Sequence, residues 1–277
     1  MTSIRVAALF VFAIFIISCS SVKHTDINYL KSAYKASTEE PTLNIFQPKD
    51  STQQHDVLIF VHGGNWNSGS KSTYSVLGRN FAKNDYVTVI PGYTLSPFAN
   101  YDTMTRQITE AITWTKENIA NYSGNPDRIF LMGHSAGGHL IALATMNPKY
   151  LNDNSLIKGL IFDDAAALDQ LKYLQENPPT DEDYYDVTWT KDPEEWRNAS
   201  PYYFLDENTP AILTYLGTKT IPSLYYYNDL FHQKLLEFQP QAKLITLNKK
   251  HVPMVTQFFW PFSTRFKEIK EFTAGIE

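Results

Sequence analysis

Residues 128–146 of this 277-residue chain read RIFLMGHSAGGHLIALATM. An apolar run of strand length leads into Gly133-His134-Ser135-Ala136-Gly137, and a run of small and apolar residues of helical length follows. A G-x-S-x-G motif between a strand and a helix is typical of a nucleophile elbow. The turn presents the serine beside a helix N-terminus, whose dipole favours a developing anion. The stretch therefore predicts Ser135 as a nucleophile; the alternative is a purely structural turn.

Strands and helices alternate along most of the chain. Apolar runs bounded by turn residues predict strands at 56–61, 85–90, 128–132, 157–162, 211–216 and 243–247. Helical spacing or composition predicts helices at 101–121, 135–146, 224–238 and 258–272. Strands that alternate with helices indicate an α/β fold, with a mostly parallel sheet covered on both faces.

Residues 165–204 interrupt this alternation and predict an insertion over the sheet. They are rich in aromatic residues: Tyr173, Tyr184, Tyr185, Trp189, Trp196, Tyr202, Tyr203 and Phe204, with Tyr225, Tyr226 and Tyr227 further on. An aromatic lid would suit apolar or aromatic groups of a substrate. Alternatively, these side chains only pack the insertion onto the sheet. The acidic side chains of the insertion predict a solvated face rather than a metal site.

The stretch His62-Gly63-Gly64-Asn65-Trp66 directly follows the predicted strand at 56–61. Two glycines allow backbone N–H groups to turn inward, and tetrahedral acyl-transfer intermediates need such donors for their oxyanion. We expect Gly63, Gly64 and the N–H of Ala136 to form this oxyanion hole. His62 beside the glycines predicts a residue that shapes the loop rather than a base.

His251 follows the last predicted strand and is the candidate general base. A serine nucleophile needs a group that takes its proton and returns it to the leaving group. The other histidines lie before strands, in the glycine-containing motifs, within helices or near the N-terminus: His24, His55, His62, His134, His139 and His232.

These motifs, in this order, resemble α/β-hydrolases of the esterase branch that includes hormone-sensitive-lipase-like carboxylesterases and kynurenine formamidases. The resemblance covers about residues 42–270 and extends to Val89-Ile90-Pro91-Gly92-Tyr93-Thr94-Leu95-Ser96-Pro97, which is similar to the "DYRLSP" stretch of that branch. It implies the α/β-hydrolase fold, hydrolysis of an ester or amide through an acyl-serine, and no metal or organic cofactor.

The acid of the triad departs from the family pattern. The family usually places an aspartate in a "G-x-x-D" loop after the penultimate strand, but here Thr220 stands at that position. A triad histidine needs a carboxylate that fixes its tautomer and stabilises the imidazolium. Asp164 at the end of the preceding strand is our preferred candidate. Asp163, Asp229 or a dyad without an acid are the alternatives.

The N-terminus predicts a targeting segment. Arg5 precedes an apolar run over residues 6–17, which is shorter than the roughly 20 residues that span a bilayer and is typical of a secretory signal. Ile16-Ile17-Ser18-Cys19 resembles a bacterial lipobox, whose cysteine is lipidated after cleavage, and Cys19 is the only cysteine. An ordinary signal peptide or an uncleaved anchor is the alternative.

We therefore expect a lipoprotein signal peptide over residues 1–18, a polar tether over 19–41 and an α/β-hydrolase domain over 42–277. The expected location is the bacterial cell envelope, on the periplasmic or outer-surface side, with a lipid on Cys19 as the membrane partner. The chain carries 24 Lys and Arg against 29 Asp and Glu, and this acidic balance argues against nucleic acid as a partner.

The function that these patterns predict is a serine carboxylesterase that cleaves small or medium carboxylic esters. An arylformamidase of the same fold is the first alternative, and the expected envelope location argues against it. A non-catalytic binding protein on a hydrolase fold is the second alternative, because the usual acid is missing.

Overall fold

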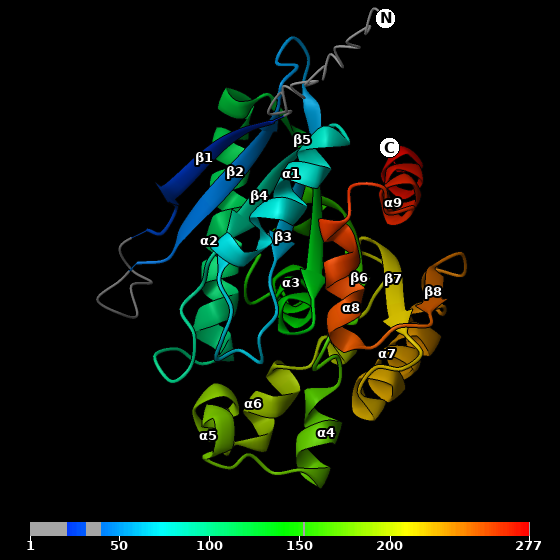
Figure 1. Cartoon of the computed structure of the whole chain (residues 1–277). Helices are drawn as coiled ribbons and strands as arrows, with labels where there is room; N and C mark the ends of the chain where they lie inside the picture. Colours follow the sequence, from blue (N-terminus) through cyan, green and yellow to red (C-terminus); the bar gives the residue numbers. More distant parts are fainter. Residues whose placement is uncertain (1–20, 32–39, 152, 277) are drawn as a thin grey trace, which may run out of the picture.

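An eight-stranded sheet runs through the protein in the order β1-β2-β4-β3-β5-β6-β7-β8 (Figure 1). The computed structural model describes residues 21–31, 40–151 and 153–276. Neighbouring strands from β4 to β8 pair in parallel, whereas β2 is antiparallel to both β1 and β4. The strands are β1 (Ser21–Asn28), β2 (Thr42–Pro48), β3 (His55–Val61), β4 (Tyr86–Pro91), β5 (Gly124–His134), β6 (Ile157–Asp163), β7 (Ala211–Gly217) and β8 (Lys243–Leu247). The predicted α/β fold with a mostly parallel sheet is confirmed.

Helices cover both faces of the sheet, which is why the inner strands are continuously apolar. On one face lie α2 (Tyr101–Asn118), α3 (Ala136–Met146) and α7 (Pro222–Leu235), around the larger apolar core. On the other face lie α1 (Ser75–Lys83), α8 (His251–Thr256) and α9 (Arg265–Ala274). Each fully buried Val or Leu of these layers contributes about 1.5–3 kcal/mol relative to an exposed one. The sheet therefore forms a rigid platform for the loops at its ends.

The predicted tether over residues 19–41 is wrong where the structure describes it as strand. Residues 21–28 form β1, the edge strand of the sheet, and pair with β2. Their sequence, SVKHTDIN, is mostly polar, and none of its side chains is fully buried, as an edge strand that faces solvent can be. Backbone hydrogen bonds to β2, rather than burial of apolar side chains, hold β1 in the sheet. The sequence of β1 therefore has no apolar pattern that would predict a strand. The sheet thus includes Ser21–Asn28, ahead of the predicted domain boundary at residue 42.

The predicted helix over residues 258–272 is also wrong at its start. A short helical turn ends at Phe259, Trp260 is extended, and the helix resumes only at Arg265 as α9. Pro261 explains the break, because proline lacks an N–H donor and disfavours helical backbone at the residue before it. The sequence also did not predict β2, α1, α8 or the short helices within residues 165–204.

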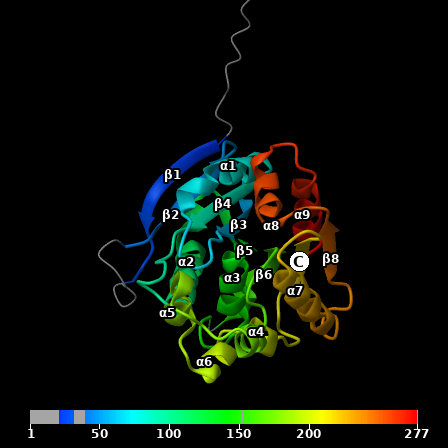
Figure 2. The ribbon, with the colours of Figure 1, turned by 60° about the horizontal axis from the view of Figure 1, so that its bottom comes forward.

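Short helices from residues 165–204 form a cap beyond the carboxyl ends of the parallel strands (Figures 1 and 2). They are α4 (Gln170–Glu176), α5 (Tyr185–Trp189) and α6 (Pro193–Asn198). His139 of α3 bonds to this cap through its Nε2, which lies 2.8 Å from the carbonyl oxygen of Ala199. Within the described residues, no helix is both long and apolar enough to cross a bilayer. The cap covers the edge of the sheet at which the candidate site lies.

Candidate active site

Ser135 occupies a strained turn between β5 and α3. Its backbone has φ 53° and ψ −122°, in a region that residues other than glycine rarely adopt. The turn also requires glycine, because a Cβ on Gly137 would lie 2.0 Å from the carbonyl oxygen of Val61. Two backbone bonds hold the turn: Ser135 N–H donates to Asp163 over 3.2 Å, and Ala166 N–H donates to Ser135 over 3.0 Å. The structure therefore has the geometry of a nucleophile elbow.

His251 lies between Ser135 and Asp164, at the first turn of α8. Its Nε2 is 2.9 Å from Ser135 Oγ, and its Nδ1 is 2.9 Å from Asp164 Oδ2. A neutral imidazole that donates Nδ1–H to the carboxylate keeps Nε2 as an acceptor for the serine hydroxyl. The structure thus brings together the three side chains that the sequence predicted as nucleophile, base and acid.

Asp164 is fully buried and is held by the two loops that meet at this point. It directly follows β6 and has φ 52°, so its backbone is strained like that of Ser135. Its Oδ1 accepts the N–H of Gly217 over 2.7 Å, and its Oδ2 accepts the hydroxyl of Thr220 as well as the imidazole. Charge-assisted bonds of this kind stabilise an ionised carboxylate and fix its orientation.

The other carboxylates considered as acids lie elsewhere. Asp163 is fully buried but, within the described chain, neither of its oxygens has a hydrogen-bond partner. Burial, and next the negative charge of Asp164, raise its pKa well above the usual value. Asp229 is exposed on α7. Of the three candidates, Asp164 is the one that contacts His251.

Thr220 has a role that the sequence reasoning missed. It lies in the loop after β7, where the family usually has its acid, and its hydroxyl donates to Asp164 Oδ2. The same oxygen is 3.5 Å from His251 Nδ1. The sequence showed only that Thr220 replaces the usual aspartate. Nothing near Thr220 in the sequence indicated that its hydroxyl bonds to a carboxylate at the end of the neighbouring strand.

His134, the residue between Gly133 and Ser135 in the G-x-S-x-G motif, supports the ring of His251. The two rings stack with centroids 4.6 Å apart, and His134 Nε2–H donates to the carbonyl oxygen of His251 over 3.2 Å. Burial, and next the charge of His251, lower the pKa of His134 to about 3. It therefore stays neutral near pH 7 and adds no positive charge beside His251.

The glycine loop after β3 packs directly behind the serine. A Cβ on Gly63 would lie 2.9 Å from Ser135 Cβ. His62 shapes this loop: its Nδ1–H donates to the Gly63 carbonyl over 2.8 Å, and its ring stacks 4.6 Å from that of Tyr93. Burial lowers the pKa of His62 to about 4, so it is neutral. Asn65, with φ 52°, lines the cavity beside Ser135.

A cavity of about 150 Å³ opens beside Ser135. Trp66, Tyr173, Tyr185 and Tyr227 contribute aromatic walls, while Gln170 and Ser223 contribute polar groups. Trp189 and Trp196 of the insertion are instead buried in the core. The aromatic residues of the insertion thus serve both roles considered above: some line the cavity and others pack the cap.

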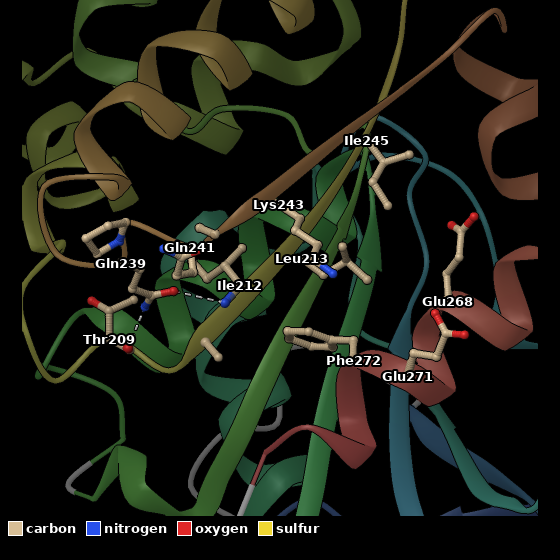
Figure 3. A pocket seen from close by; sticks show the side chains of 13 residues that line it. Thr209, Ile212, Leu213, Gln239, Gln241, Lys243, Ile245, Glu268, Glu271 and Phe272 are labelled. Carbon is tan, nitrogen blue, oxygen red and sulfur yellow. Dashed lines mark hydrogen bonds between the residues drawn. The ribbon is translucent and has the colours of Figure 1, made fainter.

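A larger cavity of about 520 Å³ lies between β7, β8 and α9 (Figure 3). Ile212, Leu213 and Phe272 line it, and Gln239 at one end donates to Thr209 and accepts the N–H of Ile212. Neither Ser135 nor His251 borders this space, so its size does not make it the reaction site.

No group of three or more His, Cys, Asp or Glu side chains in the described part of the chain is arranged to hold a metal ion.

Residues 43–235 match the BD-FAE family. The chain belongs to the BD-FAE family. Esterase LipC of Mycobacterium tuberculosis is 28% identical over 73% of this chain and 53% of its own length. The isoprenylcysteine alpha-carbonyl methylesterase ICME of Arabidopsis thaliana is 33% identical over 38% of this chain and 24% of its own length.

Solved esterases share the fold of this BD-FAE family member. Esterase B of Lactobacillus rhamnosis, inhibited by a tributyrin phosphonate, has a TM-score of 0.74 at 18% identity, over 92% of this chain and 86% of its own. The butyrate-bound Est2 of Thermogutta terrifontis has a TM-score of 0.71 at 20% identity, over 87% and 92%. The predicted resemblance to esterase-branch α/β-hydrolases is confirmed. The chain spans between about a fifth and about a half of the length of the curated relatives that it matches.

Proposed function

We propose that the protein is a serine carboxylesterase that cleaves small carboxylic esters through an acyl-Ser135 intermediate. The observation that carries this proposal is the continuous contact Ser135–His251–Asp164, with 2.9 Å at each of its two steps. The similarity to esterases supports the type of bond that is cleaved.

In the first half of the reaction, Ser135 Oγ attacks the ester carbonyl carbon while its proton passes to His251 Nε2. Asp164 accepts Nδ1–H and stabilises the imidazolium that forms. His251 then protonates the leaving alcohol as the carbon–oxygen bond breaks. In the second half, a water molecule attacks the acyl-serine with His251 again as the base, which releases the acid and restores the serine.

The oxyanion of each tetrahedral intermediate needs N–H donors near Ser135. Ala136 is the first residue of α3, so its N–H has no acceptor within the helix. In the described chain, the N–H groups of Gly64 and Asn65 likewise donate to no protein acceptor. We assign the hole to the predicted Gly63–Gly64 loop and Ala136, with Asn65 as a further donor that the cavity lining indicates.

The volume of the cavity limits the substrate. About 150 Å³ is the size of an apolar cavity that binds benzene. The group bound there is therefore a short acyl or alcohol chain, or at most one ring. The proposed reaction uses no cofactor. Lipid attachment at Cys19 and an envelope location stay predictions, since residues 1–20 lie outside those that the structure describes.

Labelling with a fluorophosphonate probe tests the proposal. Wild-type protein should react, because an activated serine attacks the phosphorus, and Ser135→Ala should not. Ser72→Ala, on the surface, is the matched control and should label like the wild type. A folded wild-type protein that fails to label under conditions where other serine esterases do would favour the non-catalytic alternative.

Two substrates separate the esterase from the arylformamidase alternative. The protein should hydrolyse p-nitrophenyl butyrate and leave N-formylkynurenine unchanged. Faster turnover of the formamide would reverse this choice without affecting the role of Ser135.

A further inference from the structure

Polar groups on one wall of the cavity beside Ser135 have hydrogen-bond partners in the protein, whereas those on another wall have none among the described residues. On one wall, Tyr185 donates its hydroxyl to Asn65 Oδ1 over 2.8 Å. On the wall formed by α4 and α7, Gln170 and Tyr227 line the cavity, yet their side-chain polar atoms bond to no protein group in the described chain. This second wall therefore carries hydrogen-bonding capacity that the protein itself does not use.

Gln170 is the more unusual of the two. Gln170 is only 3% exposed. Its side-chain nitrogen and oxygen are nevertheless not fully buried. The amide is thus withdrawn from the surface but open to the cavity. Since no protein group in the described chain bonds to this amide, its hydrogen-bonding capacity is available to a molecule that occupies the cavity beside Ser135.

Tyr227 adds a second group on the same wall. It is 8% exposed, and its ring packs edge-on against Tyr173, with centroids 6.1 Å apart. Burial, followed by the charge of Glu176, raises the pKa of Tyr227 to about 12. Its hydroxyl therefore stays protonated at neutral pH and can both donate and accept a hydrogen bond.

We propose that the cavity is a subsite for an ester whose bound group carries a hydroxyl, which Gln170 and Tyr227 recognise. A primary amide offers one acceptor and two donors, and a hydroxyl is a small group that can both donate to it and accept from it. The apolar remainder of the group contacts Trp66 and Leu224. This inference rests on the proposed esterase function and narrows its substrate class.

Two pairs of esters test the subsite, each with a methyl in place of the hydroxyl. Ethyl 3-hydroxybutanoate and ethyl 3-methylbutanoate place the group on the acyl side. 2-Hydroxypropyl acetate and isobutyl acetate place it on the alcohol side. The measured quantity is the ratio of kcat/KM within each pair, for wild type, Gln170→Met and Tyr227→Phe. Because each ratio is compared between enzymes, the intrinsic reactivity of the esters cancels.

We expect the wild type to prefer the hydroxylated ester on one side, and that side identifies the group that the cavity holds. Gln170→Met should lower this preference about 10- to 100-fold, mainly through slower turnover of the hydroxylated ester. Tyr227→Phe should lower it by a smaller factor. Asp229→Asn, at an exposed position of α7 that does not line the cavity, is the control and should leave the ratio unchanged.

Equal ratios in wild type and Gln170→Met for both pairs would overturn the subsite. That result differs from failure of the esterase itself, in which no ester is hydrolysed and the fluorophosphonate probe does not react. Loss of all activity in Gln170→Met alone would also count against recognition, because the methyl-bearing esters should still be cleaved. Tyr227→Phe then provides an independent measurement if the first variant folds poorly.

Discussion

The loops after β6 and β7 divide between them a task that the esterase resemblance assigns to the β7 loop alone. The β6 loop contributes the carboxylate, Asp164, and the β7 loop contributes two donors to it, Gly217 N–H and the Thr220 hydroxyl. The two strands are parallel neighbours, so their carboxyl ends lie at the same edge of the sheet. The imidazole needs a carboxylate at one point in space, and either loop can reach that point.

A second contrast lies within the β6 loop itself. Asp163 and Asp164 are adjacent and equally buried, but Asp163 is the last residue of β6 and Asp164 is the first beyond it. Alternation along the strand places Asp163 on the face of Ile161, which packs in the core beneath α1, α8 and α9. One carboxylate has three partners and the other has none within the described residues. Position along the strand, rather than residue type, separates the carboxylate that contacts His251 from the one that has no partner among the described residues.

The largest effect should come from exchanging each carboxylate for its amide. Asp164→Asn should lower kcat about 10⁴-fold, as the equivalent change does in a serine protease, because the amide no longer fixes the tautomer of His251. Asp163→Asn should change kcat by less than about threefold, because it leaves every contact of the three side chains in place. Steady-state kinetics on one ester measures both. Comparable losses in the two variants would remove the distinction between the two positions.

A smaller effect is expected in the β7 loop. Thr220→Val removes the hydroxyl that orients Asp164 and keeps the shape of the side chain, so kcat should fall about 10- to 100-fold. Thr220→Ser keeps the hydroxyl and should retain most of the activity. If Val and Ser behave alike, the hydroxyl does not position the acid.

The smallest effect concerns stability and pH. Because the pKa of Asp163 is raised on folding, the folded protein keeps a proton that the unfolded chain releases above about pH 4. Stability therefore falls as pH rises towards the folded-state pKa, by at most about 1.4 kcal/mol per pH unit. Asp163→Asn cannot titrate, so urea unfolding between pH 5 and 8 should show a shallower decline. Asp229→Asn, at an exposed carboxylate, should follow the wild type; a parallel curve for Asp163→Asn would contradict the shift.

The sequence predicted the parts of the molecule whose signals are local. The inner strands are continuous apolar runs, and the motif around Ser135 needs its glycines within five residues, so both could be found without coordinates. Strand β1 escaped because a polar edge strand is held by its backbone. The sequence could not decide between Asp163, Asp164 and Asp229 as the acid. Local sequence does not show toward which face of the sheet a carboxylate at a strand end points.

The bonds of Thr220 and the unpaired amide of Gln170 were beyond the sequence for a related reason. Each depends on contacts between segments that are far apart in the chain: Thr220 with Asp164, and Gln170 with the walls around Ser135. Composition and periodicity describe neighbours along the chain. They do not show which polar groups lack a partner in the folded protein.

The pairing of β1 bears on how the molecule would sit on a membrane. Ser21 pairs with Pro48, beyond the point where β2 meets the start of β4, at the end of the sheet opposite the cap (Figure 1). A lipid on Cys19, as we propose, would be joined to this strand through Ser20, a reach of about 7 Å. The base of the domain would then rest on the bilayer, with the cap and the cavity beside Ser135 at the far end of the sheet. Such an orientation favours esters that arrive from the aqueous phase over those dissolved in the lipid.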